Sequence, residues 1–189
     1  MGTVRQGAAL AVMVIGVLVA PTACSNKQTG TALPAHTDES AVVEPSELCP
    51  ALRRNAGPAI SEILGTDKVD INPAGPGGAL CRFTDVHLTG GYPTTGAGTI
   101  VPTTTDTVQD FIDKNRRTLA ARAHNIAVTP VSGLSGAQVV SGVDSIGIMR
   151  GFGAVAVQGG LLEISVFGKK ITAEKVGKLL TVVYDNATR

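Results

Sequence analysis

An uncharged segment near the amino terminus predicts the compartment in which the rest of this chain folds. Residues 7–20 read GAALAVMVIGVLVA, fourteen residues without a charged side chain, and Arg5 precedes them. A membrane-spanning helix needs about 20 apolar residues, whereas a basic flank followed by a shorter apolar core is typical of a secretory signal. The segment therefore predicts that the rest of the chain is exported. A retained membrane helix that continues through residue 23 is the alternative.

The residues after this segment resemble the lipobox of bacterial lipoproteins, in which a small residue precedes an invariant cysteine. Thr22 and Ala23 precede Cys24, and Pro21 stands where a branched apolar residue is usual. The resemblance implies that Cys24 carries a diacylglycerol thioether, that residues 1–23 are removed, and that the protein is held at the extracytoplasmic face of the cell membrane. Two acyl chains give stable attachment. Ordinary cleavage, for instance after Ser25, would instead give a secreted protein.

The cysteine count agrees with this assignment. The chain has three cysteines, Cys24, Cys49 and Cys81, and an odd thiol in an exported protein needs a role of its own. If Cys24 carries lipid, Cys49 and Cys81 remain as a pair, which predicts a disulfide that closes a loop of about 32 residues in an oxidising compartment. Metal binding is the weaker alternative, because the two cysteines lack CxxC spacing and nearby histidines.

Charge and composition divide the exported part into two regions. Loss of Arg5 with the signal reduces the 16 basic residues to 15, against 15 acidic ones, so the formal net charge becomes zero. The protein therefore lacks the basic excess that non-specific nucleic-acid binding requires. Residues 24–45 are mostly small or polar and have no apolar periodicity, which is typical of a flexible tether. We expect residues 46–189 to form one folded domain.

Two segments of this domain have the apolar periodicity of helices. The clearest helix covers residues 106–123, with Thr105 or Asp106 as its N-cap and an apolar side that includes Ile112 and Leu119. A closing helix begins after Thr172, which is a suitable N-cap. Shorter helical segments follow residue 46. Each helix has one apolar side that needs a partner.

The strand signals concentrate in the last third of the chain. Residues 80–88 form a predicted strand, residues 98–101 a weaker one, and an antiparallel meander is predicted over residues 139–142, 146–149, 154–158 and 161–167. In the last of these strands Leu162, Ile164 and Val166 alternate with Glu163 and Ser165, so one face should be buried and the other wet. We therefore expect an α+β fold in which helices pack on one face of an antiparallel sheet.

Three short motifs resemble a group of uncharacterised two-cysteine lipoproteins from the envelopes of actinobacteria. They are Leu48-Cys49-Pro50-Ala51-Leu52, Cys81-Arg82-Phe83 and the turn Gly133-Leu134-Ser135-Gly136-Ala137. The sequence departs from that group in two ways: a proline follows Cys49 instead of preceding it, and Phe83 stands where tryptophan is common. The resemblance implies a membrane-anchored domain outside the cell and no particular activity.

The sequence contains no recognised catalytic or metal-binding motif. The G-x-S-x-G, HExxH and EF-hand patterns are absent, and we interpret His87 as a strand-surface residue and His124 as a helix C-terminal residue. We expect a non-enzymatic protein without a cofactor or metal. The first hypothesis is a protein-interaction module that binds another envelope protein through its Thr-rich loop or the free face of its sheet. The alternative is a carrier that holds an apolar envelope ligand between sheet and helices, which requires an apolar cavity above about 300 Å³.

Overall fold

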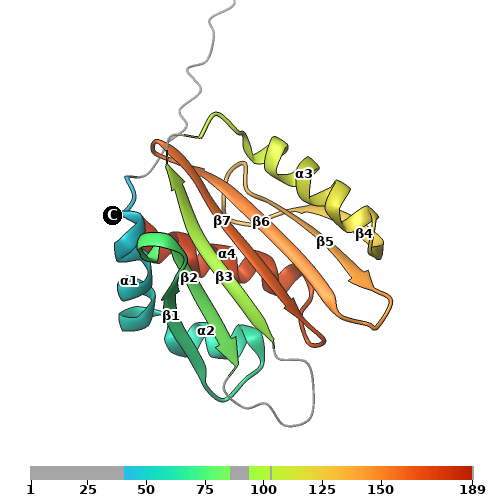
Figure 1. Cartoon of the computed structure of the whole chain (residues 1–189), viewed down its shortest axis with the longest axis horizontal. Helices are drawn as coiled ribbons and strands as arrows, with labels where there is room; N and C mark the ends of the chain where they lie inside the picture. The colour runs from blue at the N-terminus through green and yellow to red at the C-terminus, as the bar shows by residue number, and fades with distance from the viewer. Residues whose placement is uncertain (1–40, 86–93, 103, 189) are drawn as a thin grey trace, which may run out of the picture. The chain divides into compact units, whose positions relative to one another are not determined.

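The computed structural model of the chain describes residues 41–85, 94–102 and 104–188 (Figure 1). The expected signal, Cys24 and most of the expected tether lie outside these residues. The described part contains a seven-stranded antiparallel sheet, with strand order β1-β2-β3-β7-β6-β5-β4, and four α-helices. This arrangement confirms the predicted α+β class.

The strands are β1 (Val69–Ala74), β2 (Leu80–Asp85), β3 (Thr95–Pro102), β4 (Ala123–Pro130), β5 (Gln138–Asp144), β6 (Met149–Val157) and β7 (Gly160–Gly168). The helices are α1 (Leu48–Asn55), α2 (Gly57–Leu64), α3 (Val108–Ala120) and α4 (Ala173–Ala187), with short 3-10 helices η1 (Pro45–Glu47) and η2 (Pro76–Gly78).

The helices divide between the two faces of the sheet (Figure 1). Helices α1, α2 and α4 pack together on one face and share the larger core with it. Helix α3 lies on the other face, where Ile112 and Leu119 pack against Val140 of β5. Neighbouring strand residues point to opposite faces, so Val139 belongs to the larger core and Val140 to the smaller one. The sequence predicts helices on one face only. Helix α3 departs from this prediction, because its apolar side chains pack on the opposite face of β5.

Helix α4 lies very close to the middle of the sheet because the strands beneath it carry glycines. A Cβ atom on Gly151 of β6 would lie 2.5 Å from Cγ2 of Val176, which is a steric clash between non-bonded carbon atoms. Cβ atoms on Gly153 and Gly98 would lie 3.4 Å from side-chain atoms of Leu180 and Val183. These α4 side chains therefore occupy the space that strand side chains would otherwise fill.

The ends of the helices follow the polar residues that cap them. The hydroxyl of Thr172 accepts a hydrogen bond from the backbone N–H of Lys175 at 3.2 Å, which confirms the predicted cap of α4. Helix α3 is shorter than predicted and begins after Thr107, whose hydroxyl and backbone N–H form a reciprocal capping box with Asp110. The hydrogen bonds from Thr107 lower the pKa of the Asp110 carboxyl.

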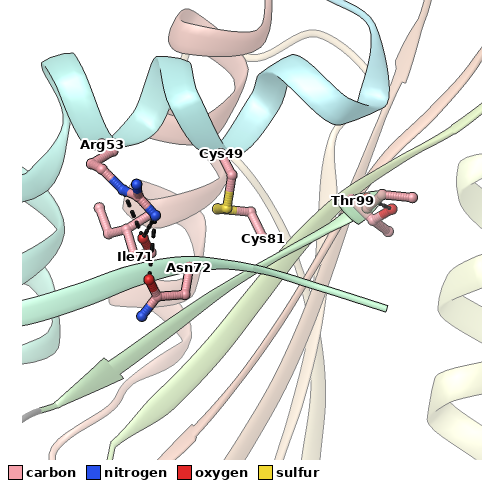
Figure 2. Close-up of a disulfide and its surroundings, with 7 residues drawn as sticks. Cys49, Arg53, Ile71, Asn72, Cys81 and Thr99 are labelled. Atoms are coloured by element: carbon pink, nitrogen blue, oxygen red, sulfur yellow. Dashed lines mark hydrogen bonds between the residues drawn. A yellow bond between two sulfur atoms is a disulfide. The ribbon is translucent and has the colours of Figure 1, made fainter. Parts of the chain in front are cut away.

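Cys49 of α1 and Cys81 of β2 form the predicted disulfide, with their Cα atoms 5.1 Å apart (Figure 2). Both residues are only 1% exposed. The bond spans 32 positions of sequence and fixes the first helix to the second strand. It therefore holds α1 against the sheet at the start of the larger core.

Gly151→Ala is expected to destabilise the domain by about 1–3 kcal/mol, the usual effect of overpacking a core. The added methyl group collides with Val176, and α4 must move away from β6. Gly57→Ala is the control, because a Cβ there meets nothing within 4 Å. Chemical denaturation measures both variants, and equal unfolding free energies would show that the approach of α4 does not depend on Gly151.

Replacement of Cys49 and Cys81 by alanine together is expected to lower the unfolding free energy by about 4 kcal/mol, the entropic contribution of a loop of this length. The reference is the oxidised protein, whose intact mass should rise by two hydrogens on reduction. An unchanged denaturation midpoint in the double variant would contradict a stabilising role.

Candidate functional site

A groove of about 620 Å³ opens beside α4. Its walls come from α2, from α4 and from the connection between β4 and β5, and its floor reaches Val139 of β5. A volume of this size lies within the range of about 300–1,000 Å³ that ligand pockets usually have. The groove therefore meets the size requirement set by the ligand-carrier hypothesis.

The inner part of the groove is apolar. Val139 is 1% exposed and Val131 is 9% exposed, and Ile63 and Val182 pack against the same core. Gly177 of α4 opens the space between them, since a Cβ at this position would lie 3.6 Å from Val131 and would begin to fill the groove. A glycine inside a helix lowers helix stability by up to about 1 kcal/mol relative to alanine. At position 177 the glycine therefore leaves space for the groove but makes α4 less stable.

The rim of the groove is polar. Lys178 and Glu174 form an ion pair at 2.8 Å, one turn apart on α4. Their hydrogen bond lowers the pKa of Glu174 and raises the pKa of Lys178, so both groups are charged at neutral pH. Hydroxyl groups of Thr129, Ser132 and Thr181 complete the rim. The arrangement can hold an apolar chain inside and a polar group at the edge.

The turn after β4 supports the groove wall. The backbone N–H of Val131 donates to the carbonyl of Ala137 at 3.0 Å, and the N–H of Leu134 donates to Val131 at 3.3 Å. These bonds hold Val131 at the groove while the chain reverses toward β5. Residues 133–137, which carry part of the family resemblance, therefore lie directly behind the wall of the groove.

The other residues singled out by the sequence lie away from the groove or outside the described residues. Cys49 and Cys81 are joined to each other and do not line it. Cys24 and His87 lie outside the described residues. His124 is exposed on β4, not at a helix end, because α3 stops at Ala120 and an edge strand follows.

The described residues were also compared with the requirements of two other kinds of site, a metal centre and a membrane-spanning helix, and they meet neither. They contain no cluster of three or more His, Cys, Asp or Glu side chains that could hold a metal ion. None of the helices within the described ranges is long and apolar enough to cross a membrane.

Sequence reasoning did not identify the groove, because its residues are scattered over α2, the β4–β5 connection and α4. One signal was present: Gly177 lies inside the closing helix, where a glycine lowers helix stability. Comparison of the chain with protein-family models, with curated proteins and with solved structures finds no match.

Proposed function

We propose that this protein is a lipid-anchored extracytoplasmic binding protein that holds the apolar chain of an envelope amphiphile in the groove beside α4. The observation that carries this proposal is the groove itself, about 620 Å³ of largely apolar space. The role is one of binding without catalysis. It corresponds to the ligand-carrier hypothesis.

The volume supports one acyl chain as the occupant. If a methylene takes about the volume of a water molecule in the liquid, ~30 Å³, the groove has room for about 20 carbons. A diacyl lipid with two long chains would exceed this volume, so the proposed ligand has a single chain. Its polar end would lie among the hydroxyls and the Glu174–Lys178 pair at the rim.

The proposed anchor would keep the domain near a source of such ligands. Seventeen positions separate Cys24 from Ala41, the first described residue, and a fully extended chain of this length spans about 60 Å. The domain would thus work within this distance of the membrane surface. The resemblance to actinobacterial envelope lipoproteins supports the same placement.

A protein-interaction module has less support, because both edge strands are modified in ways that hinder strand addition. At β1, Arg53 donates from Nε and Nη2 to the carbonyl of Ile71 at 3.0 and 2.8 Å (Figure 2), and Ser61 accepts from the N–H of Val69. At β4, the register shifts near Asn125, and Pro130 has no N–H to donate. A partner would have to use the free face of the sheet or the Thr-rich loop, part of which lies outside the described residues. An apolar ligand has a groove of suitable size.

Gly177→Leu is expected to abolish binding of a fluorescent long-chain fatty acid, because the new side chain fills the groove beside Val131. The dissociation constant should rise by at least tenfold, about 1.4 kcal/mol, and Gly177→Ala should have a smaller effect. Gly57→Leu is the matched control, since it adds the same side chain where nothing lies within 4 Å. Absence of binding to the unaltered protein, or equal binding by Gly177→Leu, would refute the proposal.

Cys24→Ala is expected to abolish metabolic labelling with palmitate and to release the protein from the membrane fraction, because the thioether sulfur is lost. The variant in which Cys49 and Cys81 are both alanine should retain its label. Membrane fractionation with labelled palmitate measures both, and a fully labelled Cys24→Ala protein would disprove the anchor.

A further inference from the structure

A second cavity lies on the opposite face of the sheet from the groove, between α3 and the central strands. It has a volume of about 280 Å³ and is lined from β2, β3, β6, β7, α3 and the residues before α3. A neighbouring hollow of about 460 Å³ over β2, β3 and β7 shares Leu80, Ala97 and Ser165 with it. The cavity is partly open to solvent and is large enough for a ligand of a few heavy atoms.

Glu163 is the unusual residue of this cavity. It lies on β7, the middle strand of the sheet, between Thr99 of β3 and Ala154 of β6. Its side chain is half-buried, and within the described residues its carboxylate forms no hydrogen bond and no ion pair. Desolvation of a carboxylate is costly unless a positive group or hydrogen-bond donors compensate. Such compensation can come from a bound ligand.

The neighbouring polar groups offer few donors to Glu163. The Thr99 hydroxyl donates to the carbonyl of Ala79 at 2.8 Å, and Nδ2 of Asn115 donates to the carbonyl of Phe111 at 2.9 Å. These bonds direct the Thr99 hydroxyl and one N–H of Asn115 to backbone carbonyls instead of to Glu163. Oδ1 of Asn115 and the Glu163 carboxylate are therefore oxygen acceptors among the residues that line the cavity.

The charged residues that line the cavity with Glu163 are Asp106 and Lys114, both exposed, and Arg82 lines the neighbouring hollow. Burial raises the pKa of Glu163, Lys114 opposes this shift, and Asp106 adds to it. With Glu163 ionised, the three groups that line the cavity carry one net negative charge, and Arg82 of the neighbouring hollow balances it. The attraction for a cation therefore comes from the Glu163 carboxylate itself.

Phe111 and Phe152 supply the apolar walls of the same cavity. They are two of the four phenylalanines in a chain that has no tryptophan. An aromatic ring attracts an organic cation within about 6 Å of its centre, and the attraction strengthens when water is excluded. A carboxylate and two phenyl side chains that line one cavity are groups that attract an ammonium group.

We propose that this cavity binds a small organic cation, a primary or quaternary amine, with Glu163 as its counter-ion and Phe111 and Phe152 as its walls. The site is independent of the groove beside α4, which lies on the other face of the sheet. Lys114 is a competing internal cation, and a bound amine would take its place near the carboxylate.

The test uses choline and ethanolamine as probes, titrated into the full-length protein at neutral pH, with the uncharged tert-butyl isostere of choline as the ligand control. Amide shifts of Ala154 and Ser165 report binding by NMR. Binding of the amines and not of the isostere is expected. Glu163→Gln should weaken it by at least about tenfold, because the amine loses its charged counter-ion, and Lys114→Ala should strengthen it severalfold by removing the competitor.

Two further measurements separate the site from a merely structural Glu163. Binding should weaken as the pH falls through the raised pKa of Glu163, because only the ionised carboxylate attracts the cation, and this dependence should vanish in Glu163→Gln. Free choline and phosphatidylcholine vesicles distinguish a soluble amine from a lipid headgroup as the source. Equal binding of the isostere, tighter binding of acetate than of choline, or an unchanged affinity in folded Glu163→Gln would overturn the proposal.

Discussion

The close approach of α4 to three glycines in the middle of the sheet is the constraint on which the rest of the structure depends. Gly98, Gly151 and Gly153 leave room on β3 and β6, and α4 fills it with Val176, Leu180 and Val183. Helices α1 and α2 then pack against α4. The groove forms along the side of α4 that these contacts leave open, so its shape depends on how deeply the helix is seated.

The strand β7 gives the two faces of the sheet different chemistry. Leu162, Ile164 and Val166 are at most 2% exposed beneath the helices, whereas Glu163 and Ser165 face the cavity beside α3. Along β7, one face of the sheet therefore presents hydrocarbon, and the other presents a carboxylate and a hydroxyl beside the smaller apolar core. A ligand on one face is separated from a ligand on the other by the thickness of the sheet.

The sequence predicted the central elements better than the edges. The alternation in residues 161–167 and the Thr172 cap arise from local patterns that tertiary packing reinforces, and the structure confirms both. The sequence did not predict strand β1, because Asn72 and Pro73 resemble a turn. It did not predict strand β4 either, because most residues of this edge strand are exposed and apolar and polar residues do not alternate along it. The segments predicted at 146–149 and 154–158 are largely one strand, β6, whose glycines resemble a break.

The candidate sites were harder to predict than the fold, with the disulfide as the exception. If Cys24 carries lipid, only Cys49 and Cys81 remain, so the cysteine count alone suggests that these two form a disulfide. The groove and the cavity instead bring together residues such as Ile63 and Val139, or Phe111 and Glu163, that are distant in the chain. Whether such residues come together depends on the order of the strands in the sheet, and the apolar periodicity of the sequence does not predict that order.

The first described residues end beside the last helix, where Val42 pairs with Thr188 and the N–H of Val43 donates to Ala187 at 2.8 Å. A mechanical load on the preceding segment would therefore enter the domain at the last turn of α4. It would act on a single β-bridge and the buried Val43 before it reached any strand of the sheet. Such a load would thus reach α4, which lines the groove, before it reached the strands of the sheet.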